Sequence, residues 1–356
     1  MLSEDIIELI EENEAYSAKA GVLSDVVLKI AFEKQWFNLW VPKEYGGLEL
    51  ELADGCRLLE SLAYWDGSLG WTVTLCAGAN MFAGFIDVAT AKTLFLSGNV
   101  CFGGSGRASG KAIPVPGGYQ LTGRWSYATG APHLSHFTCN AVVFSGEDIA
   151  ENQQELVKSF FVSREHVLIE NDWQTFGLEA TASHSFSIQD AFIPQEHCFE
   201  LSPKAATHTS LLFQYPFLPF AEFTLFVNYL GMFSRYTDLV QKNFYLRAKD
   251  ALWQEKHGKQ LFKQLDRAQQ FAEQSRKRIY ELMEETWSNL LRGDYESNAI
   301  LYSSVAAYTR QDLTVMRSHM MDLHVKCGIS AAQSDSPLNR VFRNFFTATQ
   351  HALLQS

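Results

Sequence analysis

Glycine, serine and threonine residues crowd two short loops within residues 103–130. Glycine lets main-chain N–H groups approach a ligand closely, and hydroxyl side chains both donate and accept hydrogen bonds. Such loops suit the edge of a flat polar cofactor such as an isoalloxazine ring. Between them, Pro116-Gly117-Gly118 predicts a turn between strands at 111–115 and 119–122, so both loops would sit on one hairpin. The same pattern fits an ordinary surface hairpin with glycine-rich ends.

Composition restricts the class of protein. The chain has 356 residues, of which 47% are hydrophobic and 13% aromatic, enough to fold as a globular protein of two or three packed domains. The formal net charge is -11, and no run of lysine and arginine interrupts this acidic balance. Because nucleic-acid binding requires a basic surface, we expect no nucleic-acid partner.

The cysteines predict a reducing environment. They show neither a CxxC pair nor histidines at zinc-site spacing, so we expect buried reduced thiols, no disulfides and no metal site. The six are Cys56, Cys76, Cys101, Cys139, Cys198 and Cys327. The N-terminal residues 1–21 are acidic and amphipathic, unlike a signal peptide, and no apolar run reaches the roughly 18 residues of a membrane span. We therefore expect a soluble cytoplasmic protein.

Hydrophobic periodicity divides the chain into three parts. Residues 1–97 have helical spacing and predict an N-terminal α-helical domain. Residues 98–204 contain short β-branched and aromatic runs between turn signals, which predict a central β-domain. Residues 205–356 return to long helical periods and predict a C-terminal helical bundle. The overall class is α+β.

Four motifs in this order resemble the acyl-CoA dehydrogenase superfamily, over nearly the whole chain. They are VPKEYGG at 41–47, GRWSYATG at 123–130, WQTFGLEATAS at 173–183 and PLNRVFRN at 337–344. The resemblance implies an N-terminal helical domain, a central β-barrel and a C-terminal four-helix bundle. It also implies a flavin, FAD or FMN, between barrel and bundle, and a homotetramer or homodimer.

Members that are dehydrogenases need a carboxylate base to remove a substrate proton while a hydride passes to the flavin. In many of them this base is a glutamate shortly after the last motif. Here residues 348–353 read ATQHAL and contain no carboxylate. A glutamate on another helix, such as Glu222, leaves an FAD-dependent acyl-CoA dehydrogenase as the alternative function.

A second branch of the superfamily is more similar to this chain, namely the two-component monooxygenases that use reduced flavin from a separate reductase. GRWSYATG and the sequence DGSLGW at 66–71 resemble motifs of that branch, which hydroxylates small aromatic or amine substrates. His351 stands where the branch commonly has a histidine near the flavin, and an imidazole can exchange protons near neutral pH. A solvated histidine on a terminal helix is the other interpretation.

The resemblance also implies three cofactor-binding residues. Thr129 would contact flavin N5 or O4, Tyr127 would pack against the ring, and Ser105 would face the other flavin edge. Each residue also has an ordinary structural use, because Thr129 and Ser105 could close turns and Tyr127 could belong to the barrel core. Arg343 suits either a carboxylate partner or a cofactor phosphate, and we expect the first.

Three residues depart from the family pattern. Glu179 stands where an arginine is usual, Asn344 replaces an aspartate, and Asn80 lies near a position where some monooxygenases have a second histidine. These changes open a third interpretation, a catalytically silent member that acts as a binding or scaffold protein. We expect, first of all, a flavin-dependent monooxygenase with His351 as catalytic residue and an aromatic pocket drawn from Phe213, Tyr215, Phe217 and Phe220.

Overall fold

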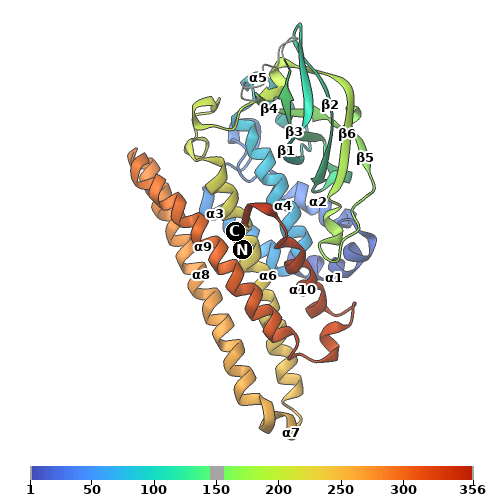
Figure 1. Ribbon diagram of the computed structural model, residues 1–356, viewed down its shortest axis with the longest axis vertical. Coiled ribbons are helices and arrows are strands. Elements are labelled where there is room, and N and C mark those ends of the chain that lie inside the picture. Colours follow the sequence, from blue (N-terminus) through green and yellow to red (C-terminus); the bar gives the residue numbers. More distant parts are fainter. Residues whose placement is uncertain (1, 145–155, 355–356) are drawn as a thin grey trace.

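A computed structural model describes residues 2–144 and 156–354. Figure 1 shows a β-sheet at one end of the molecule, long helices at the other end and a group of shorter helices between them. Among the described residues, no helix has the length and hydropathy needed to cross a lipid bilayer.

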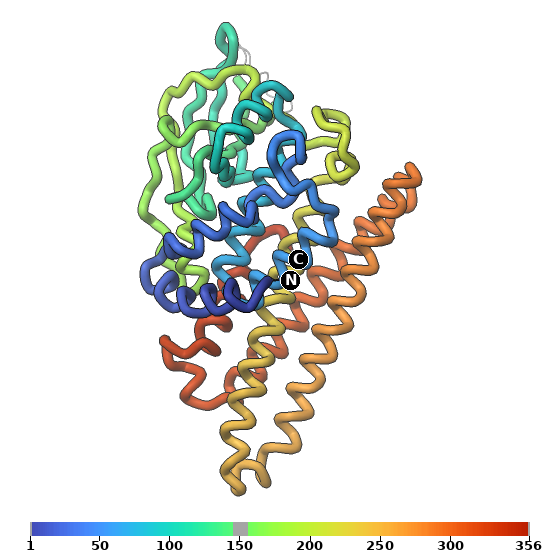
Figure 2. Tube along the Cα trace, turned by 180° about the vertical axis from the view of Figure 1, so that it is seen from behind, coloured from blue at the N-terminus to red at the C-terminus, as the bar shows by residue number. Residues whose placement is uncertain are grey.

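The N-terminal part is helical, as its periodicity predicts, and Figure 2 shows it between the sheet and the long helices. Its helices are α1 (Glu4–Ala20), α2 (Asp25–Glu33), α3 (Leu52–Trp65), α4 (Gly67–Asn80) and α5 (Val88–Leu96). The motif at 41–47 forms a short 3₁₀ turn, Lys43–Tyr45, which ends at Gly46 with φ of 83°. Glycine adopts this left-handed conformation without the strain that a side chain would cause.

The central part forms one seven-stranded sheet in the order β5-β6-β2-β1-β3-β4-β7. The strands are β1 (Phe102–Val115), β2 (Gly118–Ala128), β3 (His136–Val143), β4 (Val157–Ser163), β5 (Leu168–Glu170), β6 (His184–Pro194) and β7 (Cys198–Phe199). Strands β1 and β3 are parallel, and the other neighbouring pairs are antiparallel.

The predicted hairpin is confirmed, whereas the closed barrel is wrong for the described residues. Val115 pairs with Gly118 across the turn, and Gly117 has φ of 84°. The edge strands β5 and β7 contain three and two residues and do not pair with each other. Strands this short cannot supply the continuous ladder that closes a barrel.

The C-terminal part consists of helices, as predicted. They are α6 (Phe217–Arg247), α7 (Ala251–Trp253), α8 (Lys259–Arg292), α9 (Tyr295–His324) and α10 (Pro337–Ala348). Helix α8 buries one stripe of side chains, including Leu265, Ala272 and Ile279, at the spacing of an amphipathic helix. Helices α8 and α9 both pack against α6, and α10 contacts α6 and α9.

Helix α4 lies between the sheet and the long helices (Figure 1) and is buried on nearly all sides. Asp66 caps it, because its carboxylate accepts the Ser68 and Leu69 N–H groups at 2.8 and 3.2 Å. Small residues allow close packing around it. A Cβ at Gly70 would lie 2.4 Å from the Ala63 Cα of α3, so the two helices touch through their backbones.

This close contact predicts the effect of a single methyl group. We expect Gly70→Ala to lower the free energy of unfolding by about 1–3 kcal/mol, because the added Cβ overlaps backbone atoms that cannot move aside. Gly78→Ala is the matched control on the same helix, since its Cβ would meet only Phe220 Cε1 at 3.9 Å. Urea denaturation should show the first variant destabilised and the second unchanged or slightly stabilised. Equal effects of the two substitutions would contradict the packing argument.

Candidate functional site

Strands β1 and β2 separate beyond the hairpin, and the side chain of Trp125 fills the gap. Their pairing with each other ends at Gly110 and Gly123, while β1 stays paired with β3 as far as Phe102 and β2 with β6 as far as Ala128. The Trp125 indole N–H donates to the Asn140 carbonyl oxygen of β3 at 2.9 Å. Gly110 must lack a side chain, because its Cβ would lie 2.2 Å from the indole. Trp125 is therefore core, and the two predicted loops border the opening between the strands.

Ser105 and Thr129 lie on opposite sides of this opening. Ser105 is half-buried at the point where the β1–β3 register shifts. Two residues before it, a Cβ at Gly103 would come within 3.0 Å of the Thr129 carbonyl oxygen. The structure thus brings the two loops close together at this end, as the hairpin predicts.

Thr129 is the first member of a buried chain of hydroxyl groups. Thr181 Oγ1 donates to the Leu178 carbonyl oxygen at 2.8 Å, which uses its single proton. In the arrangement that makes all three bonds at once, Ser183 donates to Thr181 at 2.8 Å, and Thr129 donates to Ser183 at 3.0 Å. Thr129 keeps free lone pairs but no free proton. It offers a hydrogen-bond acceptor and not a donor.

Tyr127 is pushed outward by an irregularity in the sheet. The register of β2 against β6 shifts between Trp125 and Ala128, and Tyr127 has φ of 71°. A positive φ is unusual for a large side chain and marks local strain that often accompanies a functional site. The Tyr127 side chain is 61% exposed, with its ring 6.1 Å from that of Trp173. The barrel-core interpretation of Tyr127 is wrong.

His351 follows the end of α10 and is half-buried against α4. Its ring centroid lies 5.6 Å from that of Trp71. Nδ1 accepts the Leu353 N–H at 3.4 Å, which favours a neutral ring with its proton on Nε2. Burial lowers the pKa of His351, so this neutral form prevails at neutral pH. His351 therefore presents an N–H donor and is not a solvated surface histidine.

Two charged residues fix the segment that carries His351. Arg310 of α9 donates to the Leu353 carbonyl oxygen at 3.0 Å and to the Glu222 carboxylate at 3.1 Å. Burial raises the pKa of Glu222, while its ion pair with Arg310 opposes that shift. Because Glu222 is engaged with Arg310, it acts here as a structural partner, which weakens its case as a dehydrogenase base.

The departures from the family motifs have internal partners. Glu179 forms an ion pair with Arg343, so the two charges compensate each other and Arg343 has the expected structural role. Asn344 Oδ1 accepts the Leu178 N–H at 2.8 Å, which an amide oxygen does as well as a carboxylate. Asn80 is fully buried and bonds to Val100 and Phe102. These residues hold the fold together, and Asn80 is not available to a substrate.

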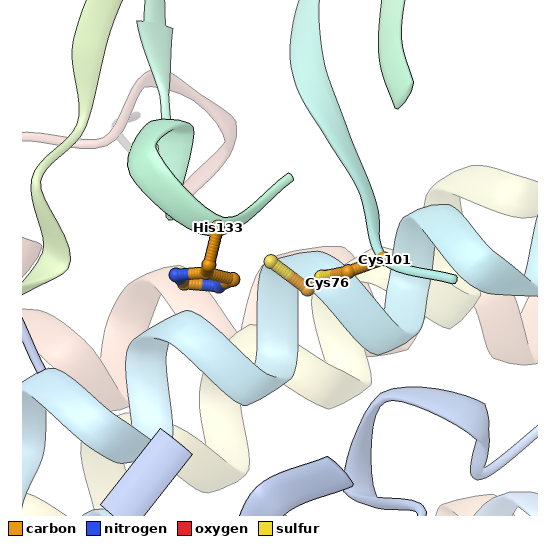
Figure 3. A group of neighbouring side chains, drawn as sticks. All are labelled: Cys76, Cys101 and His133. Carbon is orange, nitrogen blue, oxygen red and sulfur yellow. The ribbon is translucent and has the colours of Figure 1, made fainter. Parts of the chain in front are cut away.

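A cluster that the sequence spacing does not reveal lies under the Thr129 loop. Cys76 of α4, Cys101 before β1 and His133 of the turn Ala131–His133 place their ligand atoms within 4.8 Å of one another (Figure 3). The Cys76 thiol lies 3.7 Å from the Thr129 carbonyl oxygen. Hydrogen bonding by Cys101, with a smaller effect of His133, lowers the pKa of Cys76 to about 6 against the opposing effect of burial. Because Cys76, Cys101 and His133 lie far apart in the sequence, no spacing motif predicts this cluster.

The expected aromatic pocket is largely packed core. Phe213, Tyr215 and Phe220 are buried, and the Tyr215 hydroxyl donates to Thr286 of α8 at 2.7 Å. A cavity of about 80 Å³ lies instead between α2 and the start of the sheet, and none of the predicted site residues lines it.

Helix α4 connects the two halves of this candidate site. Thr129 contacts it through Cys76, and His351 contacts it through Trp71. Cys76 is five positions after Trp71 in the helix, which corresponds to a rise of about 7.5 Å along the helix axis. An acceptor hydroxyl, an exposed tyrosine ring and a neutral imidazole donor are the groups that a planar heteroaromatic cofactor and a small polar-edged substrate require. The residues present therefore fit a flavin.

Comparison with known proteins agrees with this chemistry. Residues 3–91 match the family model described as acyl-CoA dehydrogenase, N-terminal domain. An indole-3-acetate monooxygenase of Pseudomonas putida is 26% identical over 328 residues, which cover 89% of this chain and 80% of that protein. The oxygenase subunit HsaA of a flavin-dependent monooxygenase of Mycobacterium tuberculosis is 27% identical over 191 residues, 53% of this chain and 46% of its own length.

Solved structures show the same fold. The 3-HSA hydroxylase of Rhodococcus sp. RHA1 superposes with a TM-score of 0.89 at 18% identity, covering 99% of this chain and 91% of that one. XiaF of Streptomyces sp., solved with FADH2 and glycerol, has a TM-score of 0.83 at 21% identity, with coverage of 99% and 90%. Residues 3–91 thus match an acyl-CoA dehydrogenase N-terminal domain, and most of the chain is similar in sequence to a flavin-dependent monooxygenase.

Proposed function

We propose that this chain is the oxygenase component of a two-component monooxygenase that uses reduced flavin and O2 to hydroxylate a small aromatic or amine substrate. The observation that carries the proposal is the hydroxyl chain ending at Thr129, because it leaves an acceptor where a flavin edge would lie. Reduced flavin has a proton on N5 and oxidised flavin does not. An acceptor without a proton of its own therefore favours the reduced form.

The residues that would hold the flavin lie around the opening between β1 and β2. Thr129 would accept from the N5–H group, Tyr127 would cover the ring with its exposed side chain, and Ser105 would bond to the opposite polar edge. Reduced flavin, when bound, supplies the two electrons with which O2 delivers one oxygen atom to substrate and the other to water. The half-buried setting limits the access of bulk water.

His351 would act on the substrate. Its neutral ring, held through Leu353 and Arg310, would direct Nε2–H toward a substrate oxygen or nitrogen and stabilise negative charge that develops there. The names of the relatives support aromatic substrates, since they include monooxygenases of indole-3-acetate and of resorcinol.

The proposal includes a partner and an assembly. A flavin reductase would supply the reduced cofactor, as the two-component relatives imply. Exposed apolar side chains along α8, α9 and the following turn support a homo-oligomer, expected as a tetramer or dimer. They include Leu291, Tyr295, Ile300, Met321, Val325 and Ile329. All six cysteines are unpaired, which supports a reducing location such as the cytoplasm.

Thr129→Val tests the acceptor role. Valine keeps the shape but removes the oxygen, so we expect reduced flavin to bind about 5-fold more weakly, the value of one net hydrogen bond, and oxidised flavin to change by less than about 2-fold. Anaerobic titrations followed by tryptophan fluorescence measure both. Thr309→Val is the control, because Thr309 is also a buried threonine but lies on α9, outside the hydroxyl chain. Equal losses for both redox states would contradict the assignment.

Ser183→Ala tests the direction of the hydroxyl chain. Without Ser183, the Thr129 proton has lost its acceptor and can turn toward the ligand. We expect the variant to bind oxidised flavin more tightly than the wild type does, so that the preference for reduced flavin narrows by about 5-fold. The same titrations apply. An unchanged preference, in a variant that unfolds at the wild-type temperature, would mean that the chain does not control Thr129.

His351→Asn tests the catalytic assignment. We expect hydroxylation to fall by about 100-fold or more, while the affinity for reduced flavin stays within about 2-fold. Because burial lowers the pKa of His351, wild-type turnover should fall with decreasing pH only below the ordinary histidine range, and the variant should lose that limb. The neighbouring Gln350→Ala is the control, since Gln350 is exposed. Unchanged turnover of His351→Asn with resorcinol or indole-3-acetate as probe would remove this role.

A further inference from the structure

The cluster beneath the Thr129 loop has the composition of a metal site. Cys76, Cys101 and His133 come from three separate segments and meet with all three ligand atoms within 4.8 Å (Figure 3). Both cysteine side chains are 0% exposed. Thiolate sulfur and imidazole nitrogen are the ligands that zinc prefers in proteins, in sites with three or four of them.

His133 supplies an independent observation. Its Nε2 is buried and has no hydrogen-bond partner among the described residues. A buried polar atom is normally satisfied, so an orphan of this kind calls for an unseen partner. The position of a Cβ built on Gly130 would lie 2.6 Å from His133 Nε2 and 3.3 Å from Cys76 Sγ. The nitrogen and the sulfur therefore both lie close to the backbone of Gly130.

We propose that Cys76, Cys101 and His133 bind one thiophilic divalent cation, for which Zn²⁺ is the best match. Each thiol loses its proton on binding, so two thiolates balance the two charges of the ion and the buried site stays neutral. In a tetrahedral zinc site, neighbouring ligand atoms lie roughly 3.4–3.8 Å apart. Ligand atoms within 4.8 Å of one another need to close by about 1.4 Å at most.

Thr129 gives the site a consequence for the rest of the molecule. Its carbonyl oxygen lies 3.7 Å from Cys76 Sγ, so the Thr129 loop lies directly against the proposed ligands, and a water can complete the coordination. A bound ion would join α4, the entry to β1 and the turn at 131–133, and would thereby fix the loop that carries the Thr129 hydroxyl. The ion would be structural and does not depend on the proposed monooxygenase activity.

Metal binding by the full-length protein tests the proposal directly. Protein freed of metal by chelator would be titrated with Co²⁺ and then with Zn²⁺. We expect one Co²⁺ per chain, with thiolate charge-transfer absorption and the visible bands of a tetrahedral ion, displaced by one equivalent of Zn²⁺. Zinc should also raise the unfolding temperature, because the ion binds the folded chain. Absence of thiolate absorption, or zinc affinity weaker than micromolar, would overturn the proposal.

Matched variants assign the ligands. We expect Cys76→Ser and His133→Asn to weaken zinc binding by more than about 100-fold, since loss of a direct ligand costs more than loss of an outer partner. Cys56→Ser, a buried thiol of α3 outside the cluster, should bind zinc as the wild type does. Unchanged zinc affinity in Cys76→Ser would overturn the assignment. So would a Cys76–Cys101 disulfide, found by mass spectrometry, in place of bound metal after purification without reductant.

Discussion

The burial of helix α4 is the constraint on which the arrangement of the site depends. The helix touches the sheet through β1, the long helices through α6, and α10. Helices packed this closely have no space for a large side chain at the point where they cross. At the crossing of α4 and α3, Gly70 has no side chain and lies directly against the backbone of Ala63. Because α4 is held on every side, Trp71 and Cys76 become fixed points for segments that are remote in the chain. His351 and the Thr129 loop take their positions from them.

The sequence predicted those parts of the site that depend on local structure. The turn at Pro116-Gly117 follows from turn chemistry and is confirmed. The partners of Thr129 were not predictable in this way. Thr129 and Ser183 are 54 residues apart, and their contact requires β2 to pair with β6. The closed barrel was wrong for the described residues for a similar reason, because the lengths of edge strands depend on tertiary packing and not on local sequence.

The residues that depart from the family pattern, Glu179 and Asn344, each have a partner in the structure that the sequence does not reveal. Glu179 puts an anion where an arginine is usual, but its pairing with Arg343 makes the net charge of the pair zero. Asn344 retains the one property that the Leu178 N–H requires, an acceptor oxygen. A substitution in a buried network is therefore better interpreted with its partner. For this chain, the partners weaken the interpretation as a silent scaffold that rested on Glu179 and Asn344.

In the hydroxyl chain, Thr181, Ser183 and Thr129 each donate their single proton to the next acceptor. This arrangement bears on how the protein would use a flavin that diffuses on and off. A protein that takes reduced flavin from a reductase and returns it oxidised gains from an affinity that falls on oxidation. A lone hydroxyl cannot provide this difference, because it rotates to donate or accept as the ligand requires. Thr181 commits its proton to a fixed backbone carbonyl, and Ser183 transmits that commitment to Thr129. Discrimination between redox states would then originate in the backbone at Leu178, three hydrogen bonds away from Thr129 and four away from the ligand.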